Sequence, residues 1–303
     1  MTAQLALNFP DPSILQDSNG IWYAFATNGN GKHVQAAWAR DPLGPWMYYD
    51  RDVLPDTGWA TGRETWAPDV RRAVDGEYVL YFAGEVPGQQ GRHCIGVATS
   101  RPERGILGPY TPQMQPWVCP LDQGGAIDAS GFVDPATGRR YVVYKIEGYS
   151  DWACNGNNSR PGPEGGWAST PIMLQEVGAD GYSKIGQATT ILDRVEADGP
   201  LVEAPNLVRT NDGVYVLFYS SNCFNSRRYN VNYATSSRDV RGPYVRAEGP
   251  LLQTGSFGLV SPGGGTSVAG GPEVLVFHAY CPQGRCLHAT RYSSGGSRMR
   301  ILG

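Results

Sequence analysis

The most constraining feature of this chain is a sequence pattern that occurs five times, at a spacing of roughly 60 residues, as in repeat folds. Each copy opens with a short apolar segment that holds a carboxylate or a proline, and two runs of aromatic and branched residues follow. The openings are Phe9-Pro10-Asp11-Pro12, Trp66-Ala67-Pro68-Asp69, Ala126-Ile127-Asp128-Ala129, Val202-Glu203-Ala204-Pro205 and Val260-Ser261-Pro262-Gly263. Five units of one plan therefore have to assemble into one fold.

The runs inside each copy have the composition of β-strands. The first runs cover residues 22–26, 78–82, 141–144, 215–219 and 274–278, and the second runs cover 34–38, 95–99, 172–175, 231–235 and 287–290. Turn pairs such as Asn19-Gly20 and Asp75-Gly76 precede the first runs and supply the positive φ that tight hairpins need. Three or four short strands per copy predict an all-β, five-bladed β-propeller. A two-sheet sandwich is the alternative, but it leaves the fixed position of the carboxylate or proline unexplained.

We expect residues 1–303 to form a single propeller domain with blades at 8–60, 61–115, 120–190, 195–250 and 251–300. The 25 Lys and Arg residues nearly balance the 28 Asp and Glu residues, and there is no basic patch. Nucleic acid and membrane surfaces are therefore poor partners for this chain. No apolar run reaches the roughly 18 residues that a membrane helix needs.

The six cysteines favour disulfides over zinc, because their number is even and no CxxC pair is present. Cys281 and Cys286 flank a predicted hairpin tip that a disulfide could close, although buried free thiols are the alternative for several cysteines. The glycosylation sequon Asn157-Asn158-Ser159 adds a second indication of the secretory route. We expect a secreted, extracellular protein, whose leader would have been removed before Met1, since residues 1–6 do not resemble a signal peptide.

Three of the five openings carry a carboxylate among apolar neighbours: Asp11, Asp128 and Glu203. A propeller brings the first strand of every blade to the axis, so these side chains are expected to converge, at equivalent stations of the repeat. Gathering acids around an axis costs desolvation and mutual repulsion. Such an arrangement indicates proton chemistry, although a single buried aspartate more often has a structural role.

With these openings in order, together with Val276-Phe277-His278, the chain resembles glycoside hydrolase family 43 from Asn8 to about Tyr292. The resemblance implies a five-bladed propeller that hydrolyses α-L-arabinofuranosides or β-D-xylosides. It assigns Asp11 as the general base, Glu203 as the general acid and Asp128 as the carboxylate that modulates the pKa of the acid and orients it. An inverting glycosidase needs such a base and such an acid, with opposite protonation states.

Tryptophan side chains are expected to bind sugar rings, which stack on indole. Trp66 lies in the second opening, whereas Trp152 and Trp167 lie in a long insertion, residues 148–169, of a length that is uncommon without a role. We predict Trp66, Trp152 and Trp167 as substrate-binding residues. The alternative is packing between blades, which we expect for Trp22, Trp38 and Trp46.

Family members often carry a histidine in the fifth opening that helps to bind an ion near the axis. Gly264 occupies that place here, and the four histidines form no ligand cluster. We therefore predict no metal site and no required cofactor, with a structural calcium disfavoured. His278 is expected to be a satisfied polar residue at a strand end.

The function that these features predict is an inverting α-L-arabinofuranosidase, acting as a monomer on plant cell-wall polysaccharides such as arabinoxylan or arabinan. A β-xylosidase or an endo-1,5-α-L-arabinanase is the alternative, because loops decide between an exo pocket and an open cleft. A carbohydrate-binding propeller without catalysis would have lost one of the acids. Retaining fructan hydrolases fit less well, since they carry Arg-Asp-Pro where this chain has Ile127-Asp128-Ala129.

Overall fold

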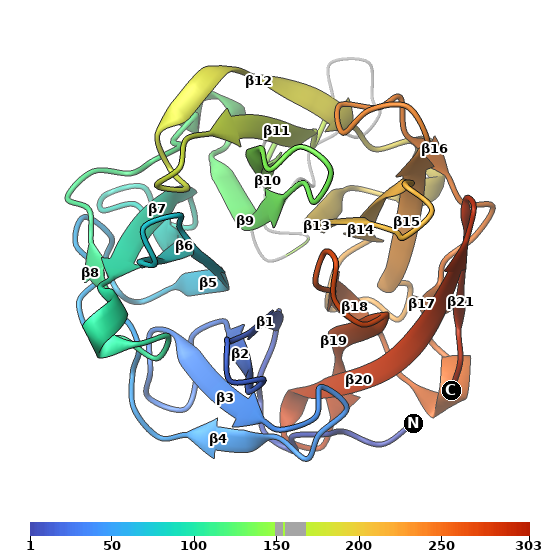
Figure 1. Ribbon diagram of the computed structural model, residues 1–303, viewed down its shortest axis with the longest axis horizontal. Helices are drawn as coiled ribbons and strands as arrows, with labels where there is room; N and C mark the ends of the chain where they lie inside the picture. Colours follow the sequence, from blue (N-terminus) through green and yellow to red (C-terminus); the bar gives the residue numbers. More distant parts are fainter. Residues whose placement is uncertain (149–153, 155–167) are drawn as a thin grey trace.

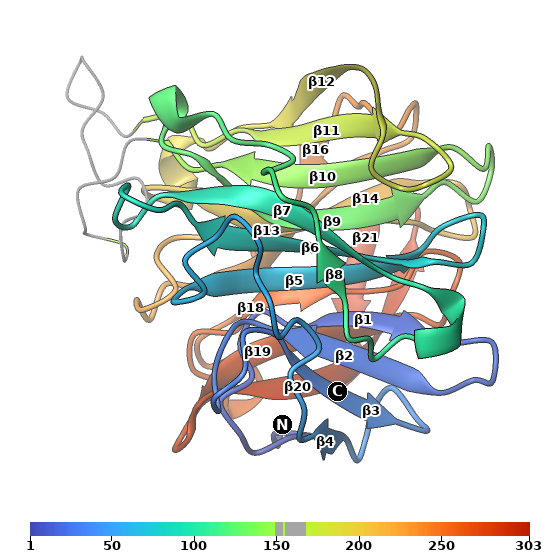
Figure 2. The same ribbon diagram turned by 90° about the vertical axis from the view of Figure 1, so that its left-hand side faces the viewer.

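The computed structural model describes residues 1–148, 154 and 168–303, and it is a five-bladed β-propeller (Figure 1). Each blade is an antiparallel sheet whose strands follow one another outward from the axis in chain order. Figure 2 shows the same ring turned by 90°. No helix in the described part of the chain is long and apolar enough to span a membrane.

The first three blades have four strands each. Blade one contains β1 (Ser13–Gln16), β2 (Trp22–Ala26), β3 (Gln35–Ala39) and β4 (Met47–Tyr49). Blade two contains β5 (Thr65–Arg72), β6 (Tyr78–Glu85), β7 (His93–Ser100) and β8 (Thr111–Pro112). Blade three contains β9 (Ala126–Val133), β10 (Arg140–Ile146), β11 (Ile172–Val177) and β12 (Lys184–Leu192).

Blade four has an extra short strand. It contains β13 (Val202–Arg209), β14 (Tyr215–Ser221), β15 (Asn230–Ser236), β16 (Val245–Arg246) and β17 (Leu252–Gln253). Blade five contains β18 (Gly263–Thr266), β19 (Val274–Cys281), β20 (Gly284–Gly295) and β21 (Arg298–Ile301). Short 3-10 turns lie in the connections: η1 (Pro102–Arg104), η2 (Leu121–Gln123), η3 (Glu196–Asp198) and η4 (Ser256–Gly258).

The predicted propeller is confirmed, and so is the strand pattern. The first predicted runs fall in the second strand of each blade, and the second runs fall in the third strand. Disulfides join Cys94 to Cys119, Cys154 to Cys223 and Cys281 to Cys286, so no described cysteine is free. The expected disulfide at the 281–286 hairpin tip is therefore confirmed, and the alternative of free thiols is wrong.

The apolar core lies between the blades. Five separate clusters of buried apolar side chains fill the five junctions between neighbouring blades. Phe25 of blade one, for example, shares a cluster with Leu80 and Phe82 of blade two. Because each sheet is covered on both faces, its inner strands are apolar on both sides, and this explains their continuous hydrophobic runs. Trp22 and Trp46 pack in these junctions, as expected.

Residues 4–9 close the ring. The N–H groups of Gln4 and Phe9 donate to the carbonyl oxygens of Leu287 (2.8 Å) and Arg285 (2.7 Å) on β20 of blade five. The chain then enters blade one, and Phe9 is fully buried in the cluster between these two blades. The first and last blades are thus joined by hydrogen bonds and apolar contacts.

Replacing Phe9 by alanine tests this closure. Because the ring of Phe9 is fully buried, we expect Phe9→Ala to lower the free energy of unfolding by about 3–5 kcal/mol in denaturant titrations. Phe257→Ala is the matched control, since Phe257 is 48% exposed and its loss should have a much smaller effect. Equal losses in the two variants would contradict a role for Phe9 in holding the ring closed.

Candidate active site

One backbone irregularity recurs in every blade, where the first strand reaches the axis. In blade two Trp66 pairs with Ala83 and Asp69 pairs with Tyr81, so two residues of β5 lie opposite one residue of β6. In each of the other four blades, two residues of the first strand likewise lie opposite one residue of the second strand. This arrangement is a β-bulge, and bulges bend a strand and redirect its side chains.

The first bulged residue has a positive φ in all five blades. These residues are Asp11, Ala67, Asp128, Ala204 and Gly264, with φ between 42° and 61°. Such a conformation is uncommon for residues other than glycine, and it is often associated with functional sites. It gives all five blades the same local backbone at the axis.

The bulge corrects one detail of the sequence prediction. Asp11 and Asp128 do occupy the same station, but Glu203 comes one residue earlier, directly before its bulge. Trp66 holds that earlier station in blade two. The predicted acids and the predicted sugar platform therefore come from two neighbouring positions of the repeat: the first bulged residue and the residue directly before it.

These side chains meet in one hollow at the end of the axis. Asp11, Trp66, Asp128 and Glu203 line a cavity of about 480 Å³, together with Phe224 and other residues. Three distant carboxyls and one tryptophan therefore converge as the sequence predicted. Trp152 and Trp167, the other predicted sugar-binding residues, lie outside the described residues.

Asp11 is held in its ionised form. Its carboxylate accepts hydrogen bonds from the Thr27 hydroxyl (2.6 Å) and from Arg285 (3.0 Å). Burial alone would raise the pKa of Asp11, but the charge of Arg285 and the hydrogen bonds outweigh it, and the pKa is lowered. The Arg285 guanidinium also lies over the ring of Phe224, 4.6 Å from its centroid. Asp11 thus has the ionised state that a base requires.

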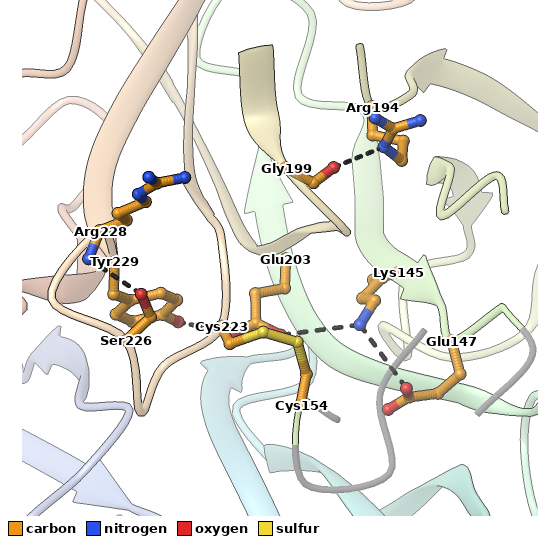
Figure 3. Close-up of a disulfide and its surroundings, with 10 residues drawn as sticks. All are labelled: Lys145, Glu147, Cys154, Arg194, Gly199, Glu203, Cys223, Ser226, Arg228 and Tyr229. Carbon is orange, nitrogen blue, oxygen red and sulfur yellow. Dashed lines mark hydrogen bonds and ion pairs between the residues drawn. A yellow bond between two sulfur atoms is a disulfide. The ribbon is translucent and has the colours of Figure 1, made fainter. Parts of the chain in front are cut away.

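Glu203 is 6% exposed and is surrounded by groups of both signs (Figure 3). Tyr229 donates a hydrogen bond of 2.6 Å to Oε1, and Lys145 Nζ lies 3.6 Å from Oε2. Burial raises the pKa of Glu203, and the opposing pull of Lys145 and Tyr229 does not cancel that rise. Glu203 therefore keeps its proton to a higher pH than an exposed glutamate.

Asp128 holds its proton more strongly than an ordinary aspartate. Burial and the neighbouring Glu203 carboxylate raise the pKa of Asp128 well above its usual range. Its Oδ2 accepts a hydrogen bond from Ala204 N (2.8 Å), which favours the ionised form. Because Asp128 and Glu203 repel each other when both are ionised, the pair retains a proton.

His278 supports Asp11 from blade five. Its Nδ1 accepts a hydrogen bond of 3.0 Å from Asp11 N, so the neutral ring carries its proton on Nε2. Burial and the charge of Arg285 lower the pKa of His278 to about 3, and the ring is neutral above that pH. The sequence predicted a satisfied polar residue at a strand end, but His278 lies inside β19, its buried Nε2 has no hydrogen-bond partner among the described residues, and the contact with Asp11 was not foreseen.

The glycines of the fifth opening make room for this arrangement. A Cβ at Gly263 would lie 1.9 Å from the Tyr229 ring, and a Cβ at Gly264 would lie 3.1 Å from His278 Nδ1. Tyr229 and His278 stack with their ring centroids 5.8 Å apart. The absence of larger side chains there thus allows two aromatic rings to reach the predicted acid and base.

Asp69, the fourth carboxylate of the openings, has a different environment. It follows the bulge of blade two, where it accepts a hydrogen bond from Gly131 N (2.7 Å) and pairs with Arg71 (3.0 Å). Burial raises the pKa of Asp69 to about 6, against the charge of Arg71. The hydrogen bond joins β5 to β9, whereas the ion pair lies within β5, so Asp69 fits a structural role.

Trp66 is well fixed as a platform. It stacks on His93, with the ring centroids 3.6 Å apart, and His93 Nε2 lies 3.2 Å from a carboxylate oxygen of Glu64. A ring held in this way can bind a sugar without losing rotamer freedom. No group of three or more His, Cys, Asp or Glu in the described ranges is arranged to hold a metal ion.

Sequence reasoning missed four residues at the site: Thr27, Lys145, Tyr229 and Arg285. Two of them had a visible signal. Lys145 is a lysine directly after an apolar strand run, and Arg285 lies inside the Cys281–Cys286 hairpin tip. For Thr27 and Tyr229 there was no signal, because their contacts depend on how the blades are placed.

A cavity lined by one carboxyl with a lowered pKa, one carboxyl with a raised pKa and an indole platform is the arrangement expected of a glycoside hydrolase. The family model for glycosyl hydrolases family 43 matches residues 5–296. The chain belongs to this family.

Known proteins agree with the family. The chain is 27% identical over 314 residues to a probable arabinan endo-1,5-alpha-L-arabinosidase C of Aspergillus flavus, covering 95% of this chain and 87% of that protein. A probable arabinan endo-1,5-alpha-L-arabinosidase A of the same fungus is 37% identical over 133 residues, 43% of this chain and 39% of that protein. A thermostable family-43 glycoside hydrolase of known structure has a TM-score of 0.78 at 21% identity, covering 98% of this chain and 93% of its own, and this supports the fold.

Gly263 provides a direct test of the site geometry. We expect Gly263→Ala to displace the Tyr229 ring, to destabilise the fold by about 1–3 kcal/mol and to slow glycoside hydrolysis at least about tenfold. Gly249→Ala is the control, because a Cβ there meets no atom within 4 Å. Denaturant titration and kcat/KM measure the two effects. A Gly263→Ala enzyme with normal activity would contradict the arrangement of Tyr229 and Glu203.

Proposed function

We propose that this enzyme hydrolyses α-1,5-linked L-arabinan within the chain, with inversion at the anomeric carbon. The observation that carries the proposal is that Asp11 and Glu203 line one cavity, with the pKa of Asp11 lowered and the pKa of Glu203 raised. The choice of arabinan is supported by the relative that covers 95% of this chain, which is named as an arabinan endo-1,5-alpha-L-arabinosidase.

The reaction needs one proton donor and one proton acceptor. Glu203 gives its proton to the glycosidic oxygen while the bond between that oxygen and C1 breaks. A water molecule attacks C1 from the opposite face and gives a proton to Asp11. Glu203 ends ionised and Asp11 ends protonated, and solvent exchange restores both. General acid–base catalysis of this kind contributes about 10²–10⁴-fold to the rate.

Neighbouring side chains keep the two roles apart. The charge of Arg285 keeps Asp11 ionised, and Asp128 opposes ionisation of Glu203 by like-charge repulsion. Trp66 offers a flat apolar face for a sugar ring, and Arg285, fixed by Phe224, offers donors for sugar hydroxyls beside the base.

An exo-acting α-L-arabinofuranosidase, the activity predicted from the sequence, is the second candidate. The disulfide between Cys154 and Cys223 favours it, because Cys223 adjoins Phe224 at the cavity wall. A covalently fixed wall on one side suits a pocket that admits a chain end. Either enzyme would act outside the cell on plant polysaccharide, and the three disulfides, which persist in oxidising compartments, support secretion.

Isosteric variants test the acid and the base. We expect Asp11→Asn and Glu203→Gln each to lower kcat/KM on debranched arabinan by about 10²–10⁴-fold, because each removes one proton-transfer group. Asp50→Asn is the control, since the Asp50 side chain is 87% exposed at the surface. Near-normal hydrolysis by either of the first two variants would refute the assignment.

The pH profile tests Asp128. Activity should rise as Asp11 ionises and fall as Glu203 ionises, so the lowered pKa of Asp11 and the raised pKa of Glu203 widen the active range on both sides. Asp128→Asn removes the carboxyl that shares a proton with Glu203, so ionisation of Glu203 no longer meets like-charge repulsion and the pKa of Glu203 falls. We therefore expect the basic limb of kcat/KM to move to lower pH. A shift of that limb to higher pH would contradict the proposed role.

Product analysis distinguishes the two candidate activities and tests inversion. An endo enzyme should release oligosaccharides of mixed length from debranched arabinan and act slowly on an aryl α-L-arabinofuranoside, whereas an exo enzyme should release arabinose. Proton NMR of the first product should show the β-anomer, which mutarotates afterwards. Initial appearance of the α-anomer would indicate a covalent intermediate and exclude a base role for Asp11.

A further inference from the structure

Lys145 is a fully buried lysine whose charge the mechanism above does not use. It lies on β10 and is 0% exposed, and its Nζ is 3.6 Å from Glu147 Oε2 and 3.6 Å from Glu203 Oε2 (Figure 3). Lysine is almost never buried completely without charged partners. An ammonium placed between two carboxylates in the interior therefore calls for an explanation.

The repeat shows what this position does in other blades. Lys145 pairs with Ile127, directly before the bulge of blade three, and the corresponding residues in blades one, four and five are Thr27, Ser220 and His278. Each of these three accepts the N–H of the bulged residue in the next blade, at 2.9–3.0 Å. Blade two has Ala83 at this station, so in three of the other four blades the station carries a hydrogen-bond acceptor that joins two blades.

Lys145 cannot act in this way, because an ammonium has no acceptor. In blade three Asp128 takes over the task and accepts the N–H of Ala204. Lys145 therefore does not join two blades as its counterparts do, and its ammonium forms ion pairs with Glu203 and Glu147 instead.

We propose that Lys145 is a positioning residue for Glu203, which holds the carboxyl group in place and stabilises the carboxylate that forms when Glu203 protonates the leaving sugar. This inference rests on the proposed function, because it assumes that Glu203 is the general acid. The negative charge appears 3.6 Å from the ammonium in a site with little water, where attraction between charges is strong.

The charges around Glu203 are consistent with this role. Burial, Glu147 and Asp11 disfavour its ionised form, whereas Lys145 and the Tyr229 hydroxyl favour it. Without Lys145 the pKa of Glu203 would rise further. A carboxylic acid with a very high pKa is a weak proton donor, so the lysine keeps Glu203 acidic enough to protonate a sugar oxygen.

The experiment compares two leaving groups in Lys145→Met. On debranched arabinan, whose leaving group is a sugar, we expect kcat/KM to fall about 10–100-fold, as a fraction of the acid-catalytic contribution. On a 4-nitrophenyl α-L-arabinofuranosyl substrate of the length that the parent enzyme accepts, the loss should stay below about threefold, because nitrophenolate leaves without a proton. The basic limb of the arabinan profile should move to higher pH.

Glu147→Gln gives the opposite shift and covers the case in which Lys145→Met does not fold. It removes an anion that raises the pKa of Glu203 and leaves Lys145 in place, so the basic limb should move to lower pH. Lys184→Met is the matched control, since Lys184 lies on the outer strand β12 against Trp117. It should change neither substrate preference nor pH profile.

Two results overturn different claims. If Lys145→Met lowers both rates by the same factor with an unmoved basic limb, or if Glu147→Gln leaves the limb in place, Lys145 has only a structural role. If the parent enzyme hydrolyses neither substrate, the proposed function itself is wrong.

Discussion

The whole structure depends on the wedge-shaped junctions between blades, which must be filled with apolar side chains on both faces of every sheet. Five such clusters fill these junctions, and the acidic side chains of the openings lie together in a cavity beside the axis. The bulges at the axis create backbone N–H groups that need acceptors, because buried donors without partners are costly. In four blades a side chain of the preceding blade accepts this N–H: Thr27, Asp128, Ser220 and His278.

The chemistry is built on this ring of hydrogen bonds. Thr27 and His278 join blades and also hold Asp11, while Asp128 joins two blades beside Glu203. Each half of the cavity also has its own cation, Arg285 near Asp11 and Lys145 near Glu203. Arg285 is partly exposed and keeps the proposed base, Asp11, ionised, whereas Lys145 is fully buried beside the proposed acid, Glu203. The same elements that stabilise the ring therefore set the two protonation states.

The sequence allowed the fold, the acids and Trp66 to be predicted because all of them lie in the repeated openings. Their partners were harder to find. Thr27, Lys145 and His278 share one station, because each pairs with the residue directly before a bulge. Their side chains differ in chemistry, so the sequence repeat does not reveal that they are equivalent. Arg285 and Tyr229 reach the site from hairpins and outer strands, and only the packing of the blades brings them there. The register difference between Asp128 and Glu203 became visible only with the bulge.

The segment that closes the ring has a further consequence. Residues 4–9 pair with β20 and lead within two residues to Asp11, and Arg285 accepts at its carbonyl from Phe9 while its side chain holds the Asp11 carboxylate. A molecule whose first and last blades have come apart would therefore lose the contacts that hold Asp11, the proposed base. Under that proposal only completely assembled molecules turn over substrate, and a half-folded or partly proteolysed copy would be silent.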